Sequence, residues 1–227
     1  FAPMRKKISY AASVPNGSIP EAEQEYFKNA LASLAHISVR EEKLALAVEK
    51  LTGKEVTTVV DPTLLLEKAD YEDLLYKDRI VKEKYIFAYY VVENEMLSKC
   101  AQRAAKEYGY RLIELHYKKT PKIKGENMIF DAGPSEFLTY IRDAELVLTN
   151  SFHGTVFSVL FQKLFYSVYK ENGRITNLLT FLNLERRHIE TDAKMDFKDK
   201  IDYTTVAEKL CSYREKSVEY LEKGIEQ

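Results

Sequence analysis

The sequence predicts an α/β protein with doubly wound, Rossmann-like parallel sheets, and three observations support this class. Strand-like and helix-like patterns alternate along nearly the whole chain. The run from Tyr85 to Val92 is wholly apolar, which is typical of a strand covered on both faces of a parallel sheet. Several strand-like runs pass directly into helix starts, as parallel strands joined by crossover helices require.

The first third of the chain predicts three short strands and two helices. The strands are expected at residues 8–12, 36–40 and 56–60, and the helices at residues 18–34 and 41–51. A turn signal at residues 15–18 ends the first strand, and Gly53 closes the second helix. Pro62 ends the third strand because proline cannot donate to a strand ladder.

The segment from residue 64 to residue 84 is highly charged, and we interpret it as a connection between two lobes that carries a short helix. Beyond it, strands are expected at residues 85–92, 110–117, 145–148 and 164–168. Helices are expected at residues 95–108, 134–143, 152–161, 174–182 and 204–226. A polar loop is expected at residues 118–127, and a charged, extended stretch up to residue 202. The predicted lobes are therefore residues 1–76 and residues 77–227.

Composition excludes several classes of protein. The chain has 227 residues, 45% of them hydrophobic, and a net charge of −1, so it has no positive field for a nucleic acid. No apolar run approaches the ~20 residues of a spanning helix. Cys100 and Cys211 are predicted to be free, packed thiols, which fits a reducing cytoplasm. The chain lacks the glycine-rich dinucleotide fingerprint, the P-loop and the usual zinc spacings, so no cofactor and no metal are expected.

The most informative turn runs from Leu148 to Thr155, where a strand leads straight into a helix. Asn150 or Ser151 is a natural N-cap, and the free N–H groups of the first turn favour an anion. His153 would then stand beside the anion with a proton that titrates near neutral pH, while Gly154 would let a ligand approach closely. The alternative is a capped helix with a partly exposed histidine.

Two further turns carry basic residues. Arg40 ends one strand, where its guanidinium could bind a carboxylate or phosphate through two hydrogen bonds. The alternative is a salt bridge to Glu41 or Glu42. Lys170 and Arg174 flank a third turn and could meet a second anion, unless that turn is simply a solvated loop.

Three segments, in this order, resemble the polysaccharide pyruvyl transferase family: residues 37–41, residues 59–65 and residues 144–154. Residues 172–179 resemble the segment that follows the family's histidine motif. The resemblance implies a two-lobed fold like that of GT-B glycosyltransferases, with the first lobe incomplete because family members extend further upstream. The upstream part is expected to contribute acceptor contacts, so this chain alone could be inactive.

The resemblance also implies a reaction. Phosphoenolpyruvate would be the co-substrate, and a hydroxyl of a bacterial cell-surface polysaccharide, or of its glycolipid precursor, would be the acceptor. The product would be a pyruvate ketal. His153 would be the acid–base residue, and Arg40 would bind the donor together with Asn150, Ser151, Gly154, Thr155, Lys170 and Arg174. The enzyme would be cytoplasmic, with peripheral membrane association through the acceptor.

Two alternatives remain open at this point. A nucleotide-sugar glycosyltransferase would share the fold and a phosphate site at a helix start. A catalytically silent protein of the same fold would keep the sheets without needing Arg40 or His153.

Overall fold

The computed structural model describes residues 7–14, 17–117, 127–190 and 199–226. They form two compact units. One consists of the described residues within 1–65, 172–183 and 204–226, and the other of those within 66–171 and 184–203. The predicted boundary at residue 76 divides the chain into two continuous stretches. The contacts instead group residues 172–183 and 204–226 with the N-terminal residues. The predicted features at residues 15–16, 118–126 and 191–198 lie outside the described residues.

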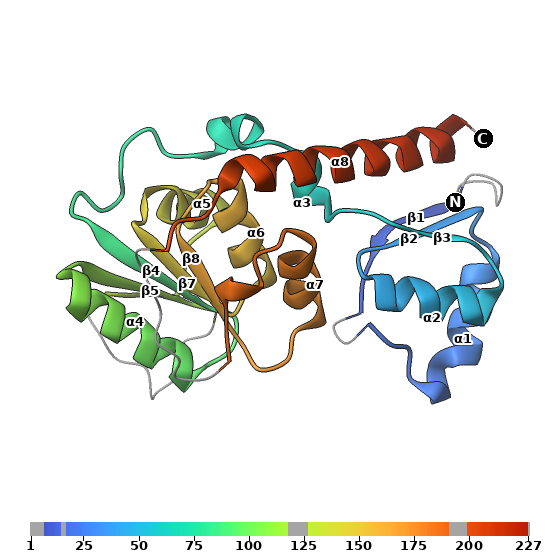
Figure 1. Cartoon of the computed structure of the whole chain (residues 1–227), viewed down its shortest axis with the longest axis horizontal. Coiled ribbons are helices and arrows are strands. Elements are labelled where there is room, and N and C mark those ends of the chain that lie inside the picture. Colours follow the sequence, from blue (N-terminus) through green and yellow to red (C-terminus); the bar gives the residue numbers. More distant parts are fainter. Residues whose placement is uncertain (1–6, 15–16, 118–126, 191–198, 227) are drawn as a thin grey trace. The chain divides into compact units, whose positions relative to one another are not determined.

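The first unit contains a parallel three-stranded sheet of order β1-β2-β3. Its strands are β1 (Ile8–Ala12), β2 (His36–Val39) and β3 (Val56–Thr58). Its helices are η2 (Glu21–Glu23), α1 (Gln24–Ala32), α2 (Glu42–Thr52), α3 (Pro62–Leu65), α7 (Gly173–Phe181) and α8 (Tyr203–Glu226). Helices α1 and α2 lie on one face of the sheet and α8 on the other (Figure 1).

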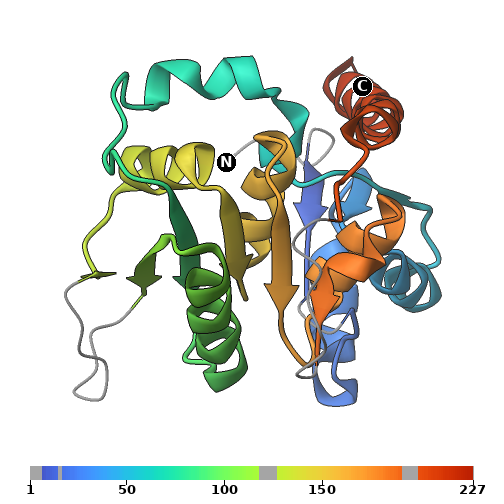
Figure 2. The same cartoon turned by 60° about the vertical axis from the view of Figure 1, so that its left-hand side comes forward.

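The second unit contains a parallel six-stranded sheet of order β6-β5-β4-β7-β8-β9. Its strands are β4 (Tyr85–Tyr90), β5 (Arg111–His116), β6 (Met128–Ile129), β7 (Leu146–Thr149), β8 (Phe165–Val168) and β9 (His188–Ile189). Its helices are η3 (Lys68–Leu74), α4 (Glu95–Tyr108), α5 (Pro134–Asp143), α6 (Phe152–Leu160) and η4 (Glu185–Arg187). Figure 2 shows this sheet from a second side, with helices on both of its faces.

Alternate residues of the central strand β4 supply the core on each face of this sheet. Ile86, Ala88 and Tyr90 pack with Leu97, Cys100, Ala101 and Ala104 of α4. On the other face, Phe87 stacks on Tyr140 of α5 with ring centroids 5.4 Å apart. Helix α4 is therefore on one side and α5 on the other, as Figure 1 shows. All of these residues are buried.

The doubly wound α/β class is confirmed, and the predicted helices and longer strands match the structure closely. The strand predicted to end at Val92 stops at Tyr90, because Val91 and Val92 leave the sheet toward Asn94, the N-cap of α4. Neither Cys100 nor Cys211 forms a disulfide, as predicted, but Cys211 is exposed on α8, so its predicted packing is wrong. None of the helices in the described part of the chain is both long and apolar enough to cross a membrane.

Candidate active site

The turn between β7 and α6 is held by side-chain hydrogen bonds within the second unit. Ser151 is the N-cap of α6, since its Oγ accepts a 3.2 Å hydrogen bond from the Gly154 N–H. The Oγ1 of Thr149 accepts from the Ser151 N–H at 3.0 Å and donates to the Tyr89 carbonyl at 2.9 Å. The sequence left the cap open between Asn150 and Ser151, and the structure assigns it to Ser151.

Asn150 ties this turn to the neighbouring loop that connects β4 and α4. Its Oδ1 accepts from the Val91 N–H at 2.9 Å, and its Nδ2 donates to the Val92 carbonyl at 2.7 Å. The amide thus uses both of its ends on the backbone of that loop, so it fixes the position of two turns relative to each other. No pattern in the sequence pointed to this contact, because the partners are backbone groups about sixty residues away in the chain.

His153 differs from every other residue of α6, a helix that the structure describes in full. Phe152 and residues 154–160 are all buried, whereas His153 in the first turn is exposed. Its ring meets the Phe152 ring edge to face, with centroids 5.4 Å apart. A titratable side chain is therefore presented at a helix N-terminus, where the backbone dipole favours an anion.

The remaining predicted residues of the second unit have different surroundings. Thr155 is fully buried and shares a 2.8 Å hydrogen bond with Ser167, which joins α6 to β8. Lys170 is exposed just after β8. It follows Tyr169, whose ring stacks on the His188 ring with centroids 3.9 Å apart. Lys170, Asn150, Ser151, His153 and Thr155 all follow the carboxyl ends of β7 and β8, which are neighbouring strands, and this edge is where open α/β sheets bind ligands.

In the first unit, Arg40 follows the carboxyl end of β2, and its guanidinium forms an ion pair with Asp61, which follows β3. The sequence had suggested Glu41 or Glu42 as the partner. The Arg40 carbonyl accepts a 3.1 Å hydrogen bond from Asn177 of α7. The predicted residue Arg174 lies in the first turn of the same helix, after the N-cap Asn172.

Glu41 adds a second buried carboxyl group to this edge. It is 3% exposed, and its Oε1 accepts a 2.5 Å hydrogen bond from Ser13. Burial raises the pKa of Glu41, while the Ser13 hydrogen bond and the charges of Arg40 and Arg174 lower it in part. Arg40, Glu41, Asp61 and Arg174 thus place two positive and two negative groups at one edge of the three-stranded sheet.

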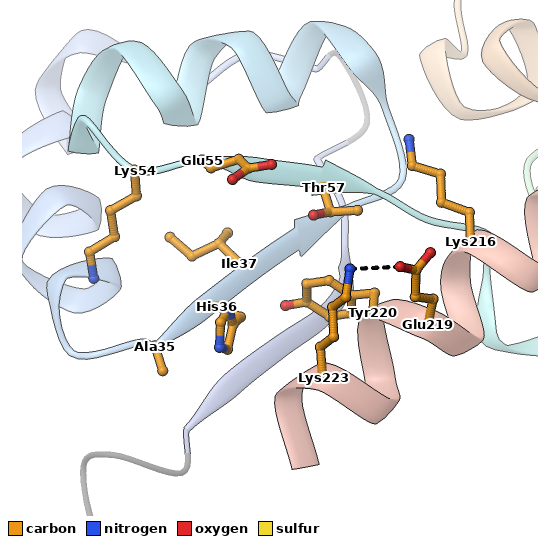
Figure 3. A pocket seen from close by; sticks show the side chains of 10 residues that line it. All are labelled: Ala35, His36, Ile37, Lys54, Glu55, Thr57, Lys216, Glu219, Tyr220 and Lys223. Atoms are coloured by element: carbon orange, nitrogen blue, oxygen red, sulfur yellow. Dashed lines mark hydrogen bonds and ion pairs between the residues drawn. The ribbon is translucent and has the colours of Figure 1, made fainter. Parts of the chain in front are cut away.

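The first unit also has a pocket of about 620 Å³ at a different place on its sheet (Figure 3). Its floor comes from the amino-terminal parts of β2 and β3, including His36 and Thr57, and its wall from Tyr220 and neighbouring residues of α8. Lys54, at one end, donates to the carbonyls of Ala32 and Leu34 at 2.8 and 2.7 Å. The pocket contains no predicted site residue. Within the described ranges, no three His, Cys, Asp or Glu side chains are grouped closely enough to hold a metal ion.

The family model of polysaccharide pyruvyl transferases matches residues 1–170 of the chain. No curated protein sequence matches it significantly. Among solved structures, the chain resembles a putative UDP-N-acetylglucosamine 2-epimerase from Listeria monocytogenes, with a TM-score of 0.52 and 10% identity. That likeness covers 92% of this chain and 60% of the epimerase, so this chain spans little more than half of that protein's length. UDP-GlcNAc 2-epimerase from Methanocaldococcus jannaschii gives a TM-score of 0.48 at 14% identity, over 86% of this chain and 55% of that one.

Proposed function

Because the chain belongs to the polysaccharide pyruvyl transferase family, we propose that it transfers a pyruvyl group from phosphoenolpyruvate to a sugar hydroxyl of a polysaccharide or its precursor. The product is a cyclic pyruvate ketal. The observation that carries this proposal is the position of His153, the exposed member of an otherwise buried helix, in the segment that the family model matches.

The chemistry requires an acid first. The enol phosphate of phosphoenolpyruvate is inert until its methylene carbon takes a proton, which leaves an oxocarbenium-like centre at C2. His153 in its protonated form supplies that proton, a contribution of typically ~10²–10⁴-fold in rate. One sugar hydroxyl then attacks C2. Phosphate leaves as a second hydroxyl closes the ketal. Of the two hydroxyl protons, one replaces the proton lost by the acid and the other leaves with phosphate.

The donor carries a carboxylate and a phosphate, and the reaction needs positive groups for both. In this proposal the first turn of α6 binds one anionic group through its N–H groups, with Lys170 nearby in the same unit. In the first unit, Arg40 and Arg174 are the cationic groups that we expect to bind an anionic group of the donor. Ser151 and Asn150 support this binding by fixing the turn.

A second candidate is a nucleotide-sugar enzyme, and the fold likeness to a UDP-N-acetylglucosamine 2-epimerase favours it. That likeness concerns the fold alone. The two candidates differ in the ligand that the folded chain binds. Thermal-shift titrations of the full chain with phosphoenolpyruvate, UDP-sugars and GDP-sugars separate them. We expect phosphoenolpyruvate to raise the melting temperature and the nucleotide sugars to leave it unchanged. The reverse result would overturn the pyruvyl transfer proposal.

A further inference from the structure

Arg40 is held at three points by residues that are far from it in the sequence. Its N–H donates to the Ala12 carbonyl at 3.0 Å, and its carbonyl accepts from Asn177 at 3.1 Å. Its guanidinium is paired with Asp61 through Nη1. The ends of β1 and β3 and the helix α7 thus fix both the backbone and the side chain of this arginine.

Asp61 divides its two carboxylate oxygens between two tasks. Oδ1 accepts from the backbone N–H of Thr63 at 3.0 Å and from the Thr63 hydroxyl at 2.6 Å. Oδ2 pairs with Arg40. Because Asp61 is only 5% exposed and is held by its own turn, its second oxygen is a fixed point for the guanidinium.

If Arg40 bound an anion through its charge alone, the ion pair with Asp61 would weaken that binding. A carboxylate beside a guanidinium cancels most of its field, and an anionic ligand has to approach both. What the carboxylate supplies is geometry. A long, flexible arginine side chain loses rotamer entropy when a ligand orders it. When a buried partner fixes it beforehand, ligand binding no longer has to bear that ordering cost.

We propose that Asp61 is a positioning residue that fixes the Arg40 guanidinium for two-pronged binding of an anionic group of the donor. The inference rests on the proposed function, since it takes phosphoenolpyruvate as the ligand of Arg40. It assigns a role to the Asp61-Pro62 segment, which the proposed chemistry does not otherwise use.

The two accounts of Arg40 predict opposite results for Asp61→Asn. If charge alone mattered, removing the carboxylate would tighten phosphoenolpyruvate binding. If Asp61 acts by positioning, the variant binds phosphoenolpyruvate about three- to tenfold more weakly, the cost of ordering one long side chain. Isothermal titration of the full chain with phosphoenolpyruvate measures the change, and Asp61→Glu should recover part of the affinity.

Two further variants separate positioning from a general structural effect. In the background of Arg40→Ala, Asp61→Asn should change the affinity no further, because its effect passes through the arginine. Thr63→Val removes the 2.6 Å bond to Asp61 but leaves the ion pair, and it serves as a control for lost stability. Because the Thr63 backbone N–H still donates to Oδ1 of Asp61, we expect this variant to bind phosphoenolpyruvate within about twofold of the wild type.

The outcomes are distinguishable from a failure of the proposed function. If the wild-type chain binds no phosphoenolpyruvate, the donor assignment is overturned and this proposal with it. If the wild type binds and Asp61→Asn binds equally well or more tightly, only the positioning role of Asp61 is overturned. A loss of affinity that persists in full in the Arg40→Ala background would also overturn it.

Discussion

Thr149 fills the space beside Gly154 at the start of α6. A Cβ atom built at residue 154 would lie 2.5 Å from the Thr149 Oγ1 and 3.0 Å from its Cγ2. The same Oγ1 accepts from the Ser151 N–H and donates to the Tyr89 carbonyl, so it is not free to turn away. Packing inside the turn therefore requires glycine at residue 154, in addition to any access that this glycine gives a ligand.

Gly154→Ala should destabilise the chain by about 1–3 kcal/mol, the usual cost of inserting a methyl group into a filled core. Urea denaturation measures the loss. In the double variant with Thr149→Ala the clash with Oγ1 and Cγ2 is gone, so the double variant should be more stable than the sum of the two single losses predicts. Strictly additive losses would show that the two side chains do not compete for the same space.

Arg40→Ala should sharply reduce stabilisation by phosphoenolpyruvate. A ligand that binds only the folded state adds ~2.7 kcal/mol at a hundredfold excess over Kd, and a site without its guanidinium loses most of that gain. Differential scanning fluorimetry with increasing phosphoenolpyruvate checks this. Arg186→Ala is the matched control, because the Arg186 side chain is 83% exposed and its ion pair with Asp199 is long, at 3.8 Å. Equal stabilisation of both variants would remove Arg40 from the donor site.

His153→Gln should lower turnover by ~10²-fold or more while donor affinity stays within a few-fold, as expected for the loss of a general acid. In the wild-type reaction in heavy water, deuterium should appear in the methyl group of the ketal. Steady-state kinetics together with mass spectrometry of the product test both points. If the variant instead binds donor weakly and turns over normally at saturation, His153 is an anion ligand, and Lys170 becomes the next candidate for the acid.

Glu41 gives a prediction about pH. Burial raises its pKa in the folded chain above the ordinary 4.5, so the folded chain binds more protons than the unfolded chain between these two values. The contribution of Glu41 to the stability of the wild type should therefore fall as the pH rises through this window. The groups that act on Glu41 are Ser13, Arg40 and Arg174, and the Tyr213 side chain of α8 senses its charge.

In Glu41→Gln this contribution is absent, so the variant should gain stability relative to the wild type as the pH rises above about 4.5 and through the raised pKa of Glu41. Urea denaturation at several pH values measures the difference. Glu42→Gln, an exposed neighbour, is the control and should track the wild type at every pH. A constant difference between Glu41→Gln and the wild type would mean that Glu41 has the same pKa in the folded and unfolded states.

The sequence was enough to predict the fold class and most of the elements because both depend on local patterns. The apolar run of β4, the Gly109 that ends α4 with φ at 65° and the proline after β3 are each visible within a few residues. The strands β6 and β9 escaped prediction. Each has two residues and carries no periodicity, and each is a strand only because β5 or β8 pairs with it.

The candidate site likewise has features that local sequence predicts and features that depend on tertiary packing. Ser151, His153 and Arg40 could be singled out from the sequence because a strand that runs into a helix marks the edge where ligands bind. The sequence alone determined which residue types stand at these turns. Only the tertiary structure decided that Arg40 pairs with Asp61, that Asn150 fixes the loop after β4, and that α7 and α8 pack with the N-terminal unit. The physical reason is that an amphipathic pattern or a charged side chain shows that a packing or ion-pair partner is needed. The packing of distant segments then selects which residue is that partner.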